Sequence, residues 1–367
     1  MLAFKALRGR GLRAPVAVLG VAVICVLVLV LRGAGGGVDD AIEGYAGQPA
    51  VDLWVMPVGT ESLLRATALL PEDISARVAS VDGVASVAPL ARAFSRVEHG
   101  DTHLAMLGLG YDVASGMGGP KAWAAGRAPS RAGEVALDRV GAWRLGVGVG
   151  DEVLVNGTSA EVVGLSVGTN LLVNQFVFQT PDAIGAQNGT AGRASYLLVA
   201  LERGVSARRV ADAIEAYVPA TRAWTREDFT ANNQHEAAEG FRPILALSFG
   251  LGAATSAILV ALIVHGLVED RRADMAVLLA LGASSWRIAL ALLLHGVVLV
   301  TSGCVLGVAA AYALAWGLDR WVPVIPLSFS GQDTVGMFAV FLIASVLATA
   351  VSVLRLRQID PMEAFRS

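Results

Sequence analysis

Lysine is almost absent from this sequence of 367 residues, which contains only Lys5 and Lys121. A phosphate-binding Walker loop needs a Gly-Lys pair, whereas Phe4 and Pro120 precede the two lysines. The chain therefore cannot hydrolyse ATP through such a loop, and an energised function would require a second chain.

Cysteine is equally scarce, because the chain contains only Cys25 and Cys304. Both fall in hydrophobic runs, where a free cysteine behaves as a small apolar residue. Two cysteines at this spacing indicate neither a disulfide framework nor a metal cluster. Chemistry is sparse elsewhere too, since no Ser-His-Asp or paired-carboxylate pattern stands out among residues that include five histidines. The composition argues against an enzyme, and a net charge of −3 offers no basic surface for nucleic acid.

Hydrophobic residues, by contrast, make up 55% of the chain, and the mean hydropathy is +0.61. This composition is typical of a protein with several membrane spans. We predict an α-helical membrane protein with four transmembrane helices and a large extracytoplasmic α+β domain between the first and second. The predicted spans are 16–32, 241–268 (including the end of a stalk), 288–318 and 335–354, and the domain occupies 33–240.

The first hydrophobic run follows a basic lead-in, residues 1–15, and this layout also fits a signal peptide. Arg32 follows the run directly, with no clear small-x-small cleavage site. The run also approaches the length that spans a bilayer. We expect an uncleaved anchor rather than a cleaved signal.

Basic residues predict the orientation of the spans, because short cytoplasmic loops are enriched in Lys and Arg. They concentrate in 1–15, in the loop 269–287 and in the tail 355–367, whereas the loop 319–334 contains only Arg320. Both termini are therefore predicted to be cytoplasmic and the large domain extracytoplasmic, in the cell membrane of a bacterium.

The large domain is predicted to contain two subdomains. In the first, strands at 51–57, 84–99 and 102–110 with a helix at 71–81 indicate a small α+β sandwich. In the second, Asn156-Gly157 lies between alternating runs and predicts a hairpin turn, because both turn positions need positive φ. Asn156-Gly157-Thr158 is also a glycosylation sequon. Further strands are expected at 176–180 and 195–201 and a helix at 205–218.

Thr225 is predicted to cap a stalk helix that runs into the second hydrophobic run, 244–268. The third run, 288–318, is longer than the bilayer requires, so one end should protrude. It also contains His295, which is either a functional intramembrane group or a residue satisfied by a neighbouring helix.

The loop 269–287 combines a charged first half with an apolar stripe formed by Met275, Leu278 and Leu279 at i, i+3 and i+4. Gly282 stands where a helix would end. This pattern predicts a short amphipathic helix at the cytoplasmic face of the membrane, where it could dock on a partner.

Two further patterns are local. In the tail, Asp360, Pro361 and Glu363 have the spacing of an N-cap, first helical position and capping box, so a one-turn helix is expected. Small residues recur at helical spacing within the spans and permit close helix contact, either between two copies or within one subunit. These residues are Gly252, Ser256, Gly303, Gly307 and Ala311.

The loop 269–287 resembles the cytoplasmic loop of FtsX/MacB-type ABC transporter permeases, R-R-x-E-x-x-x-L-R-A-x-G-A-S. Ala273-Asp274 stands where the family usually has Glu, and Leu279 stands where it often has Arg. The tail resembles the family's D-P-x-E-A-L-R with Phe365 in place of Leu, and 126–165 resembles the MacB-type periplasmic domain. The loop residues that follow the pattern are Arg271, Arg272, Leu278, Leu279, Gly282, Ala283 and Ser284.

The resemblance implies a membrane subunit that binds no cofactor itself, because a separate ABC ATPase holds ATP and Mg. A second copy or a paralogue would complete the assembly, and an extracytoplasmic adaptor or hydrolase is a further expected partner. The implied function is export or extraction of a substrate by mechanotransmission; control of a cell-wall hydrolase and an ATPase-independent scaffold are alternatives. The residues implied to contact the ATPase are Arg271, Arg272, Asp274, Met275, Leu278, Leu279, Gly282 and Ala283.

Overall fold

The computed structural model describes residues 13–64, 68–171, 174–270, 284–321 and 326–356. The chain divides into two compact units, which we describe separately. The helical unit comprises 1–36, 241–322 and 327–367, and the sheet unit comprises 37–240 with 323–326.

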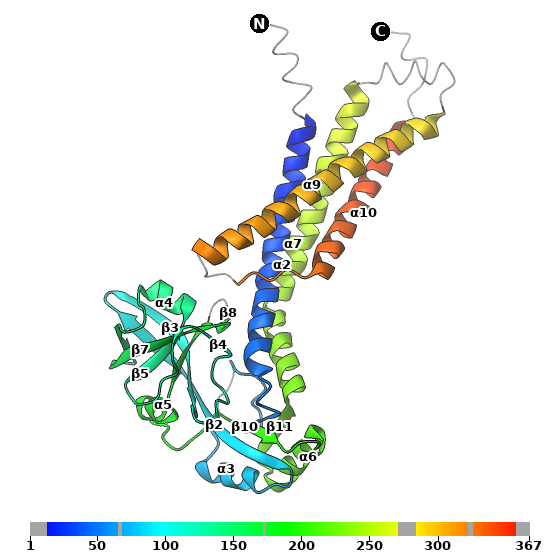
Figure 1. Cartoon of the computed structure of the whole chain (residues 1–367). Helices are drawn as coiled ribbons and strands as arrows, with labels where there is room; N and C mark the ends of the chain where they lie inside the picture. Colours follow the sequence, from blue (N-terminus) through cyan, green and yellow to red (C-terminus); the bar gives the residue numbers. More distant parts are fainter. Residues whose placement is uncertain (1–12, 65–67, 172–173, 271–283, 322–325, 357–367) are drawn as a thin grey trace. The chain divides into compact units, whose positions relative to one another are not determined.

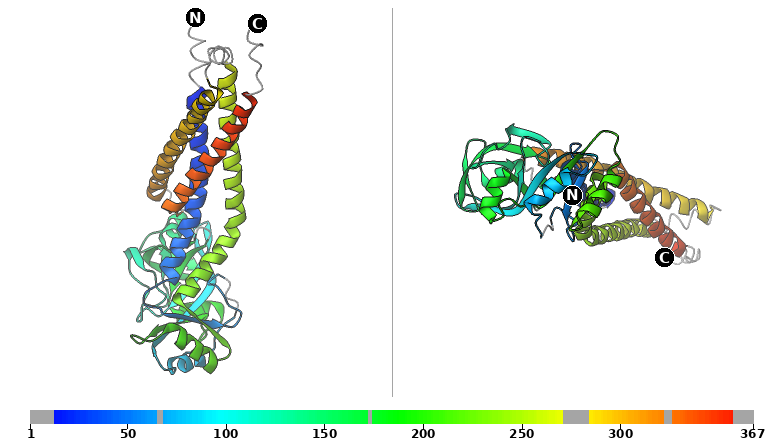
Figure 2. Two further views of the ribbon diagram at one scale, coloured as in Figure 1. Left: turned by 90° about the vertical axis from the view of Figure 1, so that its right-hand side faces the viewer. Right: turned by 90° about the horizontal axis from the view of Figure 1, so that it is seen from below.

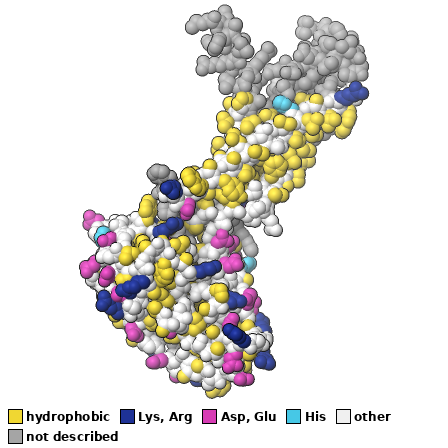
Figure 3. Space-filling view, in the orientation of Figure 1, with side chains coloured by type: hydrophobic (Ala, Val, Ile, Leu, Met, Phe, Trp, Pro, Cys, Tyr) yellow, Lys and Arg dark blue, Asp and Glu magenta, His cyan; other side chains and the backbone are white. Residues whose placement is uncertain are grey.

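Four long helices form the helical unit (Figures 1 and 2). Hydrophobic side chains dominate its visible surface, whereas charged side chains are scattered over the sheet unit (Figure 3). Its core contains Val21, Leu29, Val300 and Phe341, all at most 1% exposed. The helices that contribute to it are α2 (Arg13–Ala46), α7 (Arg226–Asp270), α9 (Ser285–Trp321) and α10 (Gly331–Leu356).

Two stretches of these helices are long and apolar enough to cross a membrane, Pro15–Ala46 and Leu290–Arg320. Within the described residues, the apolar stretches Ala246–Leu259 in α7 and Gly331–Leu347 in α10 are shorter than that criterion. Two of the four predicted spans thus have span-like helices, and the other two remain predictions.

One eleven-stranded sheet forms the sheet unit, in the order β11-β1-β10-β2-β3-β9-β5-β7-β4. Outside this order, β6 pairs with both β2 and β7, and β8 pairs with β9. The strands are β1 (Leu53–Pro57), β2 (Val84–His99), β3 (Thr102–Tyr111), β4 (Ala122–Gly126), β5 (Glu134–Asp138), β6 (Glu152–Val155), β7 (Thr158–Val167), β8 (Asn170–Leu171), β9 (Asn174–Gln179), β10 (Tyr196–Leu201) and β11 (Thr221–Thr225). The shorter helices are α3 (Glu72–Ala79), α4 (Arg139–Leu145), α5 (Pro181–Asn188) and α6 (Ala207–Tyr217).

Several local predictions are confirmed. Strand β2 spans the predicted 84–99, and β3 extends the predicted strand by one residue. Asn156 and Gly157 have φ values of 50° and 81°, in the turn between the paired strands β6 and β7. Thr225 caps α7, since its Oγ1 accepts a hydrogen bond from the Asp228 amide at 3.1 Å.

The two predicted subdomains share this one sheet. Strands β3 and β9 join them by parallel pairing, with Leu107 opposite Phe176 and Gly110 opposite Gln179. Parallel partners need a long crossover between them, so local sequence patterns do not indicate this pairing.

Helix α2 continues through residues 33–46, for which no helix was predicted, and this part of the prediction was wrong. The stretch is rich in glycine, which disfavours a helix. However, Val38, Ala41, Ile42 and Tyr45 form a stripe at i, i+3, i+4 and i+7, and all are at most 7% exposed in the core of the sheet unit. Burial of this stripe outweighs the low helix propensity of glycine.

Candidate functional site

The residues assigned to the ATPase contact and to the tail cap lie outside the described residues. Helix α7 ends at Asp270 on one side of the loop, and α9 begins at Ser285 on the other. The docking and capping roles therefore stay predictions. The residues concerned are Arg271, Arg272, Asp274, Met275, Leu278, Leu279, Gly282, Ala283, Asp360, Pro361 and Glu363.

The small residues of α9 face α2 of the same chain. A methyl group added at Gly303 would lie 2.6 Å from Val21 Cβ, and one at Gly307 would lie 2.6 Å from Cys25 Cβ. Both distances are too short for a side chain, so glycine is what lets the two backbones approach. Because both contact positions rise by four residues together, α2 and α9 run parallel.

The remaining small residues are also covered within the chain. A methyl group added at Gly252 of α7 would lie 3.0 Å from Val28 of α2 and 3.5 Å from Phe341 of α10. Ser256 and Ala311 are 0% exposed. These positions therefore serve packing within one subunit, and a second copy would have to use other faces of the helices.

Arg32 lies at a junction of three helices that the sequence analysis did not identify. Its Nη1 donates to Asp333 Oδ1 of α10 at 2.9 Å, and its guanidinium lies 5.0 Å from the ring centroid of Phe249 in α7. Next to it, the Ser328 amide donates to the Gly33 carbonyl at 2.9 Å. The only sequence signal was the position of Arg32 directly after an apolar run.

In the sheet unit, Glu134 is a buried carboxylate that several donors contact. It is 2% exposed and accepts two hydrogen bonds from Arg127 at 2.8 Å and one from the Ser130 amide at 2.8 Å. It also forms an ion pair with Arg131 at 2.8 Å. Arg127 and these hydrogen bonds hold the pKa of Glu134 well below its usual range. Glu134 thus fixes the segment before β5.

Asp138, at the other end of β5, caps α4. Its Oδ1 accepts from the Val140 amide at 2.8 Å, and its Oδ2 accepts from Thr169 Oγ1 at 2.6 Å. Burial raises the pKa of Asp138 although these hydrogen bonds oppose the shift. Both carboxylates are committed to structural contacts, and neither faces an open site.

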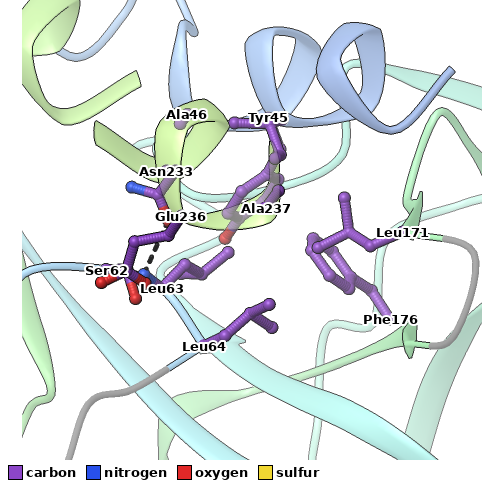
Figure 4. Close-up of a pocket in the computed structure, with 11 residues that line it drawn as sticks. Tyr45, Ala46, Ser62, Leu63, Leu64, Leu171, Phe176, Asn233, Glu236 and Ala237 are labelled. Carbon is purple, nitrogen blue, oxygen red and sulfur yellow. Dashed lines mark hydrogen bonds between the residues drawn. The ribbon is translucent and has the colours of Figure 1, made fainter. Parts of the chain in front are cut away.

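A small apolar cavity of about 100 Å³ lies inside the sheet unit (Figure 4). The end of α2, the first turns of α7, residues 62–64 and strand β9 form its walls, and Asn233 Oδ1 accepts from the Leu63 amide at 2.8 Å beside it. Pockets for drug-sized ligands are several times larger. We therefore assign no substrate to this cavity. Across the described residues, no group of three His, Cys, Asp or Glu side chains could hold a metal ion.

Two family models match the chain. The MacB-like periplasmic core domain matches residues 16–217, which is more than half of the sequence, and the FtsX-like permease C-terminal domain matches residues 246–361. The chain belongs to the FtsX/MacB family of ABC transporter permeases. This assignment confirms the resemblance that the loop and tail motifs indicated.

Solved structures similar to part of this permease include two extracytoplasmic domains and one domain of a putative permease. The extracellular domain of the noncanonic ABC-type transporter YknZ from Gram-positive bacteria is 16% identical, with a TM-score of 0.37, and the match covers 47% of this chain and 98% of that one. The periplasmic region of MacB from Actinobacillus actinomycetemcomitans is 13% identical, with a TM-score of 0.38, and the match covers 48% of this chain and 91% of that one. A domain of a putative permease from Porphyromonas gingivalis is 13% identical, with a TM-score of 0.33, and the match covers 48% of this chain and 88% of that one. The family assignment depends on the family models alone, because structural matches with TM-scores below 0.5 do not support an assignment.

No curated protein matches the chain. Membership of the family nevertheless implies an ABC ATPase partner and a bacterial membrane protein with an extracytoplasmic domain. Permeases of ABC transporters are generally not catalytic themselves. The alternative of an ATPase-independent scaffold therefore has no support from the family.

Proposed function

We propose that this permease couples ATP hydrolysis by a separate ABC ATPase to movement of its extracytoplasmic domain, and so drives export or extraction of a substrate. ATP and Mg would be bound by the partner. The observation that carries the proposal is that α2 and α7 each contribute side chains to the cores of both units.

Helix α2 contributes to the core of the helical unit through Val21 and Val28 and to that of the sheet unit through Ile42 and Tyr45. Helix α7 places Phe229 in the core of the sheet unit and packs Phe249 and Ala253 against that of the helical unit. A helix anchored in two close-packed cores resists sliding in either of them. A displacement applied at one end would therefore be transmitted along the helix.

The predicted coupling loop is attached directly to this machinery, because α7 extends to Asp270, the residue before the undescribed segment. An ATPase that moved the loop would pull on α7 itself. We propose that the apolar stripe Met275, Leu278 and Leu279 is the surface on which the ATPase acts.

The directions of the helices support four spans. A methyl at Gly20 of α2 would lie 2.9 Å from Leu259 of α7, while Gly252 faces Val28, so α2 and α7 run antiparallel. The contacts of Arg32 with Asp333 and of Gly252 with Phe341 give α10 the direction of α7. With α2 parallel to α9, the directions alternate along the chain. This alternation supports positions on one side of the membrane for both termini and the coupling loop, and the basic residues of those segments are the reason to propose the cytoplasmic side.

A second permease chain, either a copy or a paralogue, would complete the transporter together with two ATPase subunits. The small-residue positions are occupied within the chain, so we propose that the second chain contacts an exposed apolar face. On α2 such a face is formed by Val16, Leu19, Val23 and Leu27, which are 56–67% exposed. Lipid would cover any part of this face that the second chain leaves free.

Copurification tests the proposal. Full-length permease extracted from native membranes in mild detergent is expected to bring an ABC ATPase with it, and the separated permease should not hydrolyse ATP. Steady hydrolysis by the isolated chain, or a preparation without any ATPase, would contradict the two-component assignment.

Transmission along α7 can be tested by inserting Gly-Ser-Gly-Ser after Gly240. The expected result is an ATPase that still binds and hydrolyses ATP but no longer changes hydrogen exchange in the extracytoplasmic domain. The same insertion after Gly157, in the turn between β6 and β7, is the matched control and should leave the ATP-dependent change intact. An unchanged response to the first insertion would refute transmission through α7.

A further inference from the structure

The only two cysteines of the chain meet inside the helical unit. Cys25 Sγ of α2 and Cys304 Sγ of α9 lie 3.4 Å apart, and both residues are 0% exposed. Both thiols are free. Because the two residues are 279 positions apart in sequence, only the packing of α2 against α9 brings them together.

The backbone around the pair is built for close approach. Gly307, one turn beyond Cys304, leaves no space for a methyl group, which would lie 2.6 Å from Cys25 Cβ and 2.8 Å from the Ala22 carbonyl oxygen. Gly303 is similarly tight against Val21 at 2.6 Å. The thiols therefore lie in a region where the two helices approach closely, as a covalent link between helices requires.

We propose that Cys25 and Cys304 form a reversible disulfide that ties α2 to α9. The sulfur atoms would close from 3.4 Å to the bond length of about 2.0 Å. Rotation of the two side chains, or a small shift of one helix, supplies this movement.

The reaction needs a two-electron oxidant. Each thiol loses its hydrogen, the sulfur–sulfur bond forms, and the oxidant takes up two electrons and two protons. We assign this role to a quinone dissolved in the bilayer, which becomes a quinol in the same step. The disulfide is opened again by a dithiol, which is oxidised to its own disulfide.

The location of the pair favours an oxidant from the lipid phase. Cys25 and Cys304 lie in Pro15–Ala46 and Leu290–Arg320, the stretches that are apolar and long enough to cross a membrane. Buried thiols in apolar surroundings are protected from reagents dissolved in water. A lipid-soluble quinone partitions into the hydrocarbon region. Because both residues are 0% exposed in the packed helices, it reaches the sulfurs only when α2 and α9 separate transiently.

The disulfide would act as a clamp, and this consequence rests on the proposed function. Helix α2 leads directly from the helical unit into the core of the sheet unit. A covalent bond to α9 would hold α2 in close contact with it and prevent the two helices from separating during the transport cycle. The oxidised permease would then bind its ATPase but turn over slowly.

The test uses the full-length permease in lipid nanodiscs with a fully substituted benzoquinone, which cannot add a thiol to its ring. The expected result is a loss of two hydrogen atoms in the intact mass and a linked peptide pair containing Cys25 and Cys304. Dithiothreitol, added after denaturation so that it reaches the buried bond, should reverse both changes. If both thiols of the treated and then denatured protein can still be alkylated, the proposal is wrong.

A displaced cysteine provides the matched control. The double variant Cys304→Ala with Ala311→Cys moves the thiol about 10 Å along the axis of α9, to a position that is also 0% exposed. No disulfide should form in this variant. Efficient linkage to position 311 would mean that the contact seen at Cys304 has no special role, and it would overturn the proposal.

A second measurement separates the clamp from the proposed coupling. In the complex with its ATPase, oxidation should lower ATP turnover several-fold in the wild type and leave Cys304→Ala unchanged. A disulfide that forms without slowing turnover would refute the clamp. A permease that binds no ATPase would refute the proposed function, while the mass measurement on the permease alone still decides the disulfide.

Discussion

At the scale of single residues, the buried carboxylate of Glu134 is a structural anchor of the sheet unit. Glu134 is 2% exposed and is contacted by Arg127, Arg131 and Ser130. The side chains of the two arginines are 54% and 73% exposed. A buried anion with this many donors is stabilising only while all of them remain. The charge of Glu134 is therefore a structural requirement of the extracytoplasmic domain.

Glu134→Gln should lower the free energy of unfolding at neutral pH by about 2 kcal/mol, the usual contribution of hydrogen bonds to a charged group. Because the folded-state pKa is lowered, the stabilisation is complete above the ordinary value near 4.5 and is lost as the pH falls below it. Urea unfolding of the full chain, followed by tryptophan fluorescence, measures the free energy of unfolding of both proteins. The difference between the wild type and Glu134→Gln should become smaller in acid.

Glu98→Gln is the control for this prediction. Glu98 pairs with Arg96 at 2.7 Å, but the arginine is 56% exposed. An exposed pair of this kind contributes about 0.5 kcal/mol or less. If the two variants were destabilised equally at neutral pH, the special role of Glu134 would be disproved.

At the scale of elements, glycines in the long helices have two different roles. Gly307 of α9 lies against the backbone of α2, with the Ala22 carbonyl oxygen 2.8 Å from the position of a Cβ atom, whereas Gly317 of the same helix has nothing within 4 Å. The sequence pattern singled out Gly307 as a small residue at helical spacing, but it did not show which helix covers that position. Their environments distinguish the two glycines, because only one of them permits a close helix crossing.

Gly307→Ala should therefore separate α2 from α9 and lower the melting temperature of the purified permease, at a cost of about 1–3 kcal/mol for an overpacked site. Gly317→Ala should be neutral or stabilising by about 0.5–1 kcal/mol, since alanine is the better helix former. Thermal unfolding in one detergent measures both variants. Equal melting temperatures would show that the contact with Ala22 does not limit the approach of the helices.

At the scale of the whole molecule, the central prediction concerns the coupling loop. An exposed apolar stripe usually marks an interface, and a charge placed in a desolvated contact costs several kcal/mol, on the order of 2–7 for a polar group and more for an ion. Leu278→Asp should leave expression and insertion near normal but abolish copurification of the ATPase.

Ala280→Asp is the matched control, because position 280 lies about 160° around a helix from position 278 when successive residues turn by about 100°. It should retain the ATPase. If Leu278→Asp also retained the ATPase at the wild-type level, the stripe would contact lipid or the tail instead, and the coupling role would have to be abandoned.

The orientation of the chain is the second prediction at this scale. Single cysteines at Ser130 and Ser330, introduced into a chain that lacks Cys25 and Cys304, should react in intact cells with a thiol reagent that cannot cross membranes. A cysteine at Ser285 should not react, because it borders the predicted cytoplasmic loop. Labelling at Ser285 from outside would reverse the assigned topology.

What the sequence determined by itself was the family and the local structure. The Asn156-Gly157 turn, strand β2 and the Thr225 cap depend on neighbouring residues, and a short stretch of sequence contains all that their geometry requires. The loop and tail motifs indicated the permease family for the same reason, although the structure does not describe those segments. Hydropathy likewise indicated where the long helices lie.

Only the tertiary structure decided which distant residues meet. Burial of Tyr45 and its neighbours extends α2 through a run of glycines, parallel pairing of β3 with β9 merges the two predicted subdomains, and packing of α2 on α9 brings Cys25 to Cys304. Each of these contacts joins positions whose spacing in sequence carries no signal. The free energy that selects them comes from burial and close packing, which are properties of the assembled fold.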